Sequence, residues 1–145
     1  MNNSEIIIDS SVILKWLFQD ETHITPALRI KKHFESKKVL ISIPYLFFYE
    51  VSNVLKNGIK KGRINMKIAD KFYESLLQLE LRAYTSKELL REAFNKAIAL
   101  DISSYDASYI VLAEYLKIPF YTADEKLLQK AKGKYLYHLN KYPLK

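Results

Sequence analysis

Four carboxylic acids in this chain stand at positions where chemistry is more plausible than packing. Asp9 directly follows the apolar run of residues 6–8, and Asp124 closely follows the apolar segment 120–122. In parallel α/β sheets, the crevice outside the carboxyl ends of the strands is where ligands bind. Asp106 belongs to the first turn of an expected helix just before the second of these segments. We therefore expect these aspartates to point into one acidic crevice.

Glu50 is the acid that is hardest to explain as a structural residue. Its neighbours three and four positions away on a helix over residues 45–56 are Leu46, Phe47, Asn53 and Val54. No Lys or Arg stands where an ion pair within the helix would need it. A buried carboxylate requires a cation from elsewhere in the fold or must be neutralised. A buried arginine and a metal ion are the two alternatives, and we favour the metal ion.

The three aspartates also have a structural alternative as helix caps. Asp9 and Asp124 each precede an expected helix, where an aspartate can accept hydrogen bonds from free backbone N–H groups. Asp106 lies three residues after Ser103, a spacing that resembles a capping box. None of the three is decisive by itself.

A single divalent cation would account for all four acids at once. Crowded carboxylates repel each other, and protonation or a bound divalent ion relieves that repulsion. Oxygen ligands without cysteine or histidine favour Mg²⁺ or Mn²⁺ over zinc. The chain has no cysteine, and we expect His23, His33 and His138 to be surface residues without ligand spacing. Such an acidic site is suited to phosphodiester hydrolysis.

The charge distribution favours a polyanionic substrate. The chain of 145 residues, which we expect to be a single domain over 1–145, has a formal net charge of +7, all of it from residues 56–145. Part of the excess is in the stretch 56–63, where Lys60, Lys61 and Arg63 could contact the phosphates of a nucleic acid. The alternative is that these residues only keep an exposed turn soluble. No segment approaches the roughly 20 apolar residues of a bilayer span, and we expect a cytoplasmic protein without a signal peptide.

Strands and helices alternate along the chain, which predicts a three-layer α/β/α sandwich with a mainly parallel sheet. Strands are expected over residues 5–8, 39–43, 81–85, 120–122 and 135–139. Helices are expected over residues 10–18, 24–36, 44–56, 65–80, 86–100, 103–118 and from 124 onward. Pro44 is expected at the first helical position, and Asn57-Gly58 is expected to end that helix. In the helix over 86–100, the residues expected to face inward are Leu89, Leu90, Ala93, Ala97 and Ile98.

The order and spacing of four short segments resemble those of the PIN-domain ribonucleases, and in particular the VapC-like toxins of toxin–antitoxin pairs. These segments are Ile7-Ile8-Asp9-Ser10-Ser11, Tyr49-Glu50-Val51, Ser104-Tyr105-Asp106-Ala107 and Tyr121-Thr122-Ala123-Asp124. The resemblance extends from residue 5 to about residue 139. It implies a parallel sheet with an acidic pocket at one edge.

The resemblance also implies an activity and its partners. It implies Mg²⁺- or Mn²⁺-dependent cleavage of RNA, with metal-binding acids at Asp9, Glu50, Asp106 and Asp124, of which Asp124 is the position that varies most. Ser11 and Thr122 would support these acids by hydrogen bonds. An antitoxin protein and a second copy of the chain would be the protein partners.

Three other functions have to be weighed against a toxin. A housekeeping RNA-processing nuclease would use the same residues, and a non-catalytic RNA-binding scaffold would not need the acids. A phospho-receiver domain would have paired acids after its first strand, whereas Asp9 has no adjacent acid. We therefore expect a metal-dependent endoribonuclease.

Overall fold

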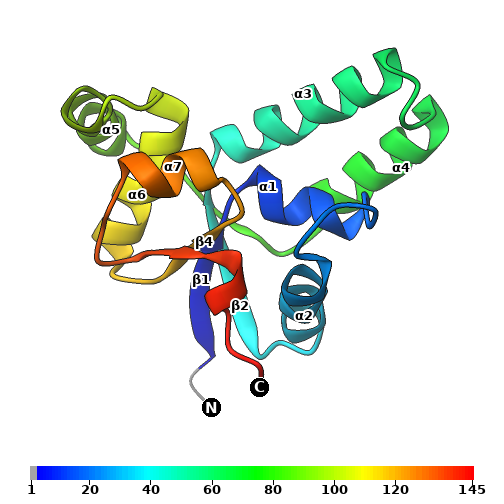
Figure 1. Ribbon diagram of the computed structural model, residues 1–145, viewed down its shortest axis with the longest axis horizontal. Helices are drawn as coiled ribbons and strands as arrows, with labels where there is room; N and C mark the ends of the chain where they lie inside the picture. The colour runs from blue at the N-terminus through cyan, green and yellow to red at the C-terminus, as the bar shows by residue number, and fades with distance from the viewer. Residues whose placement is uncertain (1–2) are drawn as a thin grey trace.

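A parallel sheet of five strands forms the centre of the computed structural model, which describes residues 3–145 (Figure 1). The strands are β1 (Ser4–Ile8), β2 (Val39–Pro44), β3 (Arg82–Tyr84), β4 (Phe120–Thr122) and β5 (Leu136–His138). Their order across the sheet is β3-β2-β1-β4-β5, and every neighbouring pair is parallel. The α/β fold expected from the alternating pattern is confirmed.

Helices connect the strands and cover both faces of the sheet, as parallel strands require. They are α1 (Ser10–Ile13), α2 (Ile24–Glu35), α3 (Leu46–Lys60), α4 (Met66–Leu77), α5 (Lys87–Leu100), α6 (Ser104–Leu116) and α7 (Glu125–Lys130), with short 3₁₀ turns at Leu14–Trp16 and Leu139–Lys141. Helix α6 packs on β1, β2 and β4, while α1 and α2 lie on the other side of the strands (Figure 1). Helices α3 and α4 form a hairpin that projects from the sheet.

The buried strands explain why the acids are held in fixed places. Ile7, Ile8 and Phe120 are completely buried, so the β1–β4 pair is the dry centre of the core. At about 25 cal/mol per Å² of apolar surface, each such side chain contributes roughly 1.5–3 kcal/mol relative to an exposed one. The residues that follow β1 and β4 therefore leave the sheet from a rigid base.

The boundaries of α3 differ from those expected. Pro44 is the last residue of β2, and the helix continues through Asn57 and Gly58 to Lys60. A Schellman motif follows the helix: Gly62 has a φ of 72° and its N–H donates to the carbonyl of Ile59, while the N–H of Arg63 donates to that of Gly58. Gly58 has another role: a Cβ there would lie 3.2 Å from Ile64, so glycine lets the α3–α4 hairpin close.

No helix within residues 3–145 combines the length and the apolarity that crossing a bilayer requires.

Candidate metal centre

The four acids expected to act together lie at the carboxyl edge of the sheet. Asp9 follows β1, Asp124 follows β4, Glu50 comes from α3, and Asp106 comes from the first turn of α6. The charges of Asp106 and Asp124 both act on Asp9, and those of Asp9 and Asp106 act on Glu50. Four segments of the chain thus contribute negative charge to one edge of the sheet.

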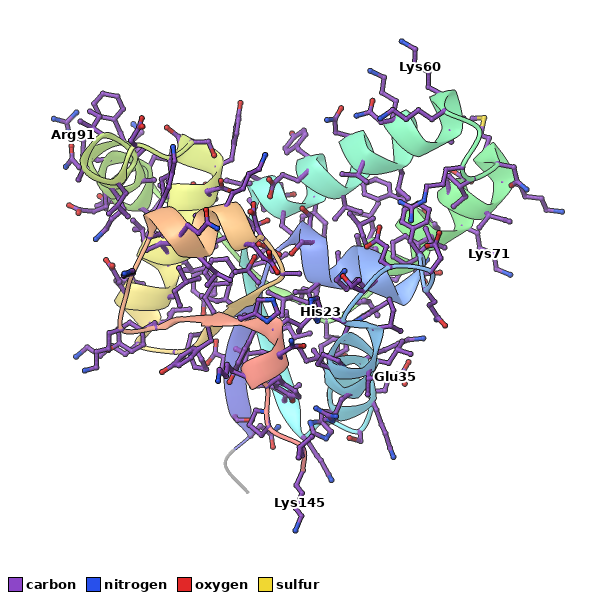
Figure 2. The ribbon with its side chains drawn as sticks, viewed as in Figure 1. His23, Glu35, Lys60, Lys71, Arg91 and Lys145 are labelled. Carbon is purple, nitrogen blue, oxygen red and sulfur yellow. The ribbon has the colours of Figure 1, made fainter. Side chains whose placement is uncertain are left out.

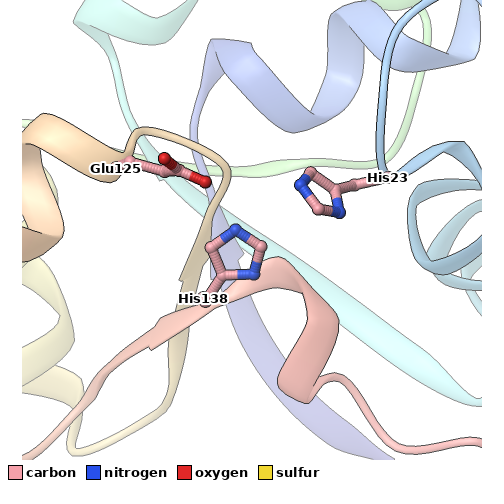
Figure 3. Close-up of side chains that lie close together, drawn as sticks. All are labelled: His23, Glu125 and His138. Atoms are coloured by element: carbon pink, nitrogen blue, oxygen red, sulfur yellow. The ribbon is translucent and has the colours of Figure 1, made fainter.

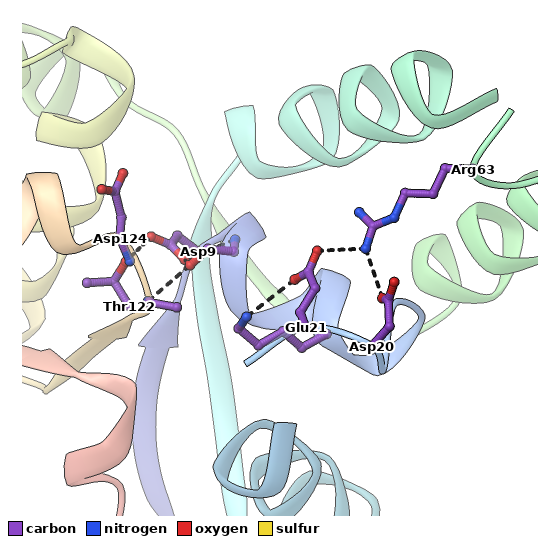
Figure 4. A network of polar contacts seen from close by, with 9 residues as sticks. Asp9, Asp20, Glu21, Arg63, Thr122 and Asp124 are labelled. Atoms are coloured by element: carbon purple, nitrogen blue, oxygen red, sulfur yellow. Dashed lines mark hydrogen bonds and ion pairs between the residues drawn. The ribbon is translucent and has the colours of Figure 1, made fainter. Parts of the chain in front are cut away.

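Asp9 is the buried centre of a hydrogen-bond network that joins β1 to β4 (Figure 4). One carboxylate oxygen accepts from the backbone N–H of Ser11 (3.1 Å) and from its hydroxyl, and the other accepts from the hydroxyl of Thr122 (2.5 Å). The Ser11 hydroxyl in turn accepts from the N–H of Ala123 (3.1 Å), and the Thr122 hydroxyl accepts from that of Asp124 (3.0 Å). Ser11 and Thr122 therefore hold Asp9 in one orientation.

Helix capping accounts for only part of what the aspartates do. Asp9 caps α1 through Ser11, and one oxygen of Asp124 accepts from the N–H of Leu127 (3.1 Å) at the start of α7. At α6 the cap is the hydroxyl of Ser103, which accepts from the N–H of Asp106 (3.0 Å). Asp106 needs no carboxylate for this cap, so its side chain remains available for a ligand.

Glu50 has a tyrosine as its partner, and within residues 3–145 no arginine pairs with it. The hydroxyl of Tyr109 donates to a carboxylate oxygen of Glu50 over 2.5 Å. Tyr109 is 1% exposed and stacks on Phe120 of β4, with ring centroids 5.4 Å apart. A neutral donor orients the carboxylate but leaves its charge uncompensated. The alternative of a buried arginine partner is therefore wrong.

The pKa values of these acids show that the crevice resists negative charge. Burial raises the pKa of Asp9 to about 6. The hydrogen bonds from Ser11 and Thr122 act to lower this pKa, whereas the charges of Asp106 and Asp124 raise it further. Burial likewise raises the pKa of Glu50 to about 7, against the opposing hydrogen bond from Tyr109. Burial and then the charge of Asp124 raise the pKa of Asp106. Within residues 3–145, no Lys, Arg or His forms an ion pair with any of the four acids.

This donor set fits a hard divalent cation. All four ligands would be carboxylates, and an ion at this place would compensate the buried negative charge of Asp9, Glu50 and Asp106, whose pKa values are raised by burial first and by neighbouring acids second. In the part of the chain that the structure describes, no three of these carboxylates lie within 4.8 Å of one another. Mg²⁺ keeps several water ligands and binds only one or two carboxylates directly. This spacing of the four carboxylates is therefore compatible with Mg²⁺.

His23, Glu125 and His138 form a second group of polar side chains, one that the sequence did not indicate (Figure 3). One ligand atom of each lies within 4.8 Å of the others, and the two histidine rings meet edge to face with centroids 4.8 Å apart. We expected surface residues without ligand spacing, but His23 and His138 are half-buried and lie at a spacing from Glu125 that could suit a ligand. His23 is the N-cap residue of α2, Glu125 begins α7 and His138 ends β5, so only the fold brings the three together.

The hydrogen bonding of His138 argues against a metal at this second group. Its Nδ1 accepts from the backbone N–H of Asn140 over 3.0 Å, so in the neutral ring the proton is on Nε2. A metal ligand needs a free lone pair on the nitrogen that faces the ion. Since neither nitrogen of His138 offers one, we assign no ion to this group.

Arg63 has a structural role that the sequence did not reveal. Its guanidinium pairs with Asp20 (2.9 Å) and Glu21 (3.1 Å) and lies 3.9 Å from the centroid of the Phe18 ring (Figure 4). Glu21 also pairs with the buried Lys15 (3.3 Å). Arg63 therefore fastens the α3–α4 turn to the loop before α2, and we withdraw it as a phosphate contact. Lys60 and Lys61 are exposed, and Figure 2 shows Lys60 projecting from the hairpin.

Together, the parallel sheet and its acidic edge define an α/β protein with an anionic crevice at the carboxyl ends of its central strands. The chain belongs to the PIN-domain family, which it matches over residues 6–133. It is a distant homologue of VapC ribonucleases, because it is 31% identical over 84 residues to ribonuclease VapC3 of Pyrobaculum aerophilum. This alignment covers 57% of the chain and 64% of that relative, which is less than two thirds of its length.

Solved structures show the same fold over nearly the whole chain. PAE2754 from Pyrobaculum aerophilum superposes with a TM-score of 0.70 at 23% identity, covering 96% of this chain and 93% of that one. VapC20 of Mycobacterium tuberculosis, described as a sarcin-ricin-loop-cleaving toxin, gives 0.62 at 16% identity, covering 90% and 92%. VapBC2 from Rickettsia felis, solved with a DNA fragment from its promoter, gives 0.63 at 14% identity, covering 92% and 98%.

Proposed function

We propose that this protein is a metal-dependent endoribonuclease that hydrolyses RNA phosphodiester bonds, and that it is the toxin of a toxin–antitoxin pair. One observation carries the first part of the proposal: the charges of four carboxylates act on one another at the edge of the sheet, and within residues 3–145 no Lys, Arg or His pairs with them. The homology to VapC ribonucleases supports RNA as the substrate. The likeness to VapBC2 of Rickettsia felis and VapBC-1 of Haemophilus influenzae supports an antitoxin partner, and a homodimer is part of the same proposal.

In the proposed reaction, Asp9, Glu50, Asp106 and Asp124 hold one or two Mg²⁺ or Mn²⁺ ions. A divalent ion bound there would supply the positive charge that activates water and stabilises the reacting phosphate. Glu50, which forms no ion pair with a Lys, Arg or His within residues 3–145, suits the role of accepting a proton from the attacking water. Tyr109 keeps the Glu50 carboxylate turned toward the crevice, and Ser11 and Thr122 do the same for Asp9.

The test of this function is cleavage of a labelled RNA by the purified protein. We expect cleavage with Mg²⁺ or Mn²⁺, none with EDTA, and recovery when the metal is restored in excess. Growth arrest on induction of the wild-type chain, absent when Asp9→Asn is induced to the same level, would support the toxin role. Cleavage that persists in EDTA would contradict the metal-dependent mechanism.

The exposed pair Lys60 and Lys61 is proposed to contact RNA phosphates beyond the crevice. We expect the double variant Lys60→Glu, Lys61→Glu to weaken RNA binding most at low salt. The binding free energy that it loses comes from the release of counterions by phosphate contacts, which contributes most at low salt. The slope of log K against log salt should become shallower by about 0.7 for each lost phosphate contact with single-stranded RNA. Filter binding across a salt series measures this slope.

A matched control is Lys87→Glu, which reverses an exposed charge at the start of α5, on the opposite side of the molecule (Figure 1). Its salt slope should equal that of the wild type. An unchanged slope in the Lys60 and Lys61 variant as well would show that these residues serve solubility alone.

A further inference from the structure

Two exposed tyrosines stand directly before two of the site acids. Tyr49 precedes Glu50 on α3, and Tyr105 precedes Asp106 on α6. Their exposed fractions are 72% and 65%, which is high for large rings in a protein whose other tyrosines include several buried ones. Single exposed apolar residues are ordinary. What requires an explanation is that each of these two exposed rings is adjacent in the sequence to a site acid.

Both tyrosines line the same cleft as Glu50. This cleft has a volume of about 550 Å³ and is lined by Ser10, Leu46, Tyr49, Glu50, Asn53, Val54 and Tyr105. Helix α3 supplies most of its wall, and the starts of α1 and α6 supply the rest. Pockets that hold small organic groups measure roughly 300–1,000 Å³, so this cleft has room for a nucleotide beside Glu50.

The rings are free to receive a ligand. Within residues 3–145, neither Tyr49 nor Tyr105 stacks on another aromatic ring, and neither hydroxyl has a hydrogen-bond partner. By contrast, Tyr109, on the same helix as Tyr105, uses both its ring and its hydroxyl within the chain. The planar faces at the mouth of the cleft are therefore unoccupied by the protein itself.

We propose that Tyr49 and Tyr105 bind unpaired nucleobases of the RNA substrate by stacking, next to the phosphate held at the acids. This inference rests on the proposed function, since it names the part of RNA that the same site recognises. Unpaired bases stack on exposed aromatic side chains, whereas bases within a duplex are not accessible to them. The neutral walls of Leu46, Asn53 and Val54 suit a base better than a phosphate. The site therefore selects single-stranded or splayed-out RNA.

The test compares Tyr49→Ser and Tyr105→Ser with Tyr49→Phe and Tyr105→Phe. Since stacking of one base contributes roughly 1–3 kcal/mol, each serine variant should raise KM for a labelled single-stranded RNA about tenfold. The phenylalanine variants should keep wild-type KM, because they retain the ring. Tyr115→Ser is the matched control: Tyr115 is 68% exposed on the same helix, about 15 Å from Tyr105 along its axis.

A second substrate series identifies the base as the group that is recognised. The same RNA is made with one abasic ribose at each position in turn. At the positions that stack, the abasic RNA should be cleaved equally by wild type and serine variants, because the contact is already lost. If removal of the base and removal of the tyrosine ring lower cleavage additively at every position of the RNA, the proposal is overturned.

Two further measurements separate the possible failures. If the wild type cleaves RNA and Tyr49→Ser behaves like Tyr115→Ser, the stacking proposal fails and the nuclease function stands. If the wild type does not cleave RNA at all, quenching of 2-aminopurine in a labelled RNA still tests stacking, and equal quenching by wild type and serine variants overturns it. A change of sedimentation coefficient in the serine variants would mean that a second copy of the chain covers the rings, which also overturns the proposal.

Discussion

Replacing Asp9 with asparagine is expected to reduce metal-dependent RNA cleavage by about a thousandfold or more, while making the metal-free protein more stable at neutral pH. A bound cation contributes several kcal/mol of charge stabilisation to phosphoryl chemistry, and each 1.36 kcal/mol corresponds to roughly tenfold in rate. Asp9 is the most deeply buried of the four acids, and both its oxygens are oriented by hydrogen bonds. Its loss should therefore cost more activity than loss of a peripheral acid such as Asp124.

The stability gain follows from the raised pKa of Asp9. A shift of its pKa from 3.8 to about 6 means that the ionised form destabilises the metal-free fold at neutral pH by about 3 kcal/mol. Asparagine carries no charge, its oxygen can still accept from Ser11, and the Thr122 hydroxyl can turn to accept from its amide. A loss of about 1 kcal/mol for the weakened hydrogen bonds leaves a net gain.

Urea unfolding in EDTA and RNA cleavage in Mn²⁺ measure the two effects on the same preparations. Asp70→Asn is the control, because it removes an equal charge from an exposed position on α4. It should leave both activity and stability near those of the wild type. An Asp9→Asn protein that is inactive and also less stable would indicate that Asp9 is mainly a structural cap.

The sequence was sufficient for the fold because its strongest patterns are local. The apolar run before Asp9 and the apolar segment 120–122 are both found as buried central strands. Such runs need no knowledge of their partners, since a strand covered on both faces must be apolar at every position. Parallel pairing then places the following aspartates at one edge without further information.

Contacts between distant segments were beyond the reach of sequence patterns. The sequence showed that Glu50 has no partner on its own helix, but Tyr109 lies 59 positions away and only the packing of α6 on the sheet brings it near. Arg63 likewise was predicted to contact phosphates because it lies in a basic stretch, but in the fold it pairs with Asp20 and Glu21. A charged side chain in a basic stretch does not itself disclose which acid it meets.

Helix α5 shows the same limit for packing. Leu90 and Ile98 were expected to face inward, but they are 60% and 67% exposed. The helix packs on α6 through Ala93 and Ala97, which meet Ala107 and Val111. Small residues allow a close approach that covers only a narrow face of the helix. Hydrophobic spacing identified the helix but could not tell a narrow buried face from a wide one.

The metal-free protein is expected to lose stability as pH rises from about 4 to about 7, and Mg²⁺ or Mn²⁺ should reverse this trend. The folded-state pKa values of Asp9 and Glu50 are about 6 and about 7, against ordinary values of 3.8 and 4.5. Between the ordinary and the raised values, the folded protein binds more protons than the unfolded chain does. Stability therefore falls as pH rises through this range, by about 3 kcal/mol from Asp9.

A divalent ion reverses this dependence of stability on pH, because it binds the ionised carboxylates of the folded state. Below about pH 5 protons occupy the site and exclude the metal, whereas between about pH 5 and about pH 7 metal binding displaces protons from Asp9 and Glu50 into solution. Metal affinity should thus rise with pH over the same window in which the metal-free fold weakens. Isothermal titration calorimetry in two buffers of different ionisation enthalpy measures the number of protons released.

Urea unfolding of wild type and Asp9→Asn, each in EDTA and in excess Mg²⁺, at about pH 5 and about pH 7.5, isolates the contribution of the site. Carboxylates elsewhere in the chain affect both proteins equally, so the difference between them reports Asp9. We expect the wild type in EDTA to lose stability relative to Asp9→Asn at the higher pH and to recover it in Mg²⁺. If the two proteins show the same pH dependence in EDTA, Asp9 is ordinarily ionised in the fold, and its burial creates no demand for a cation.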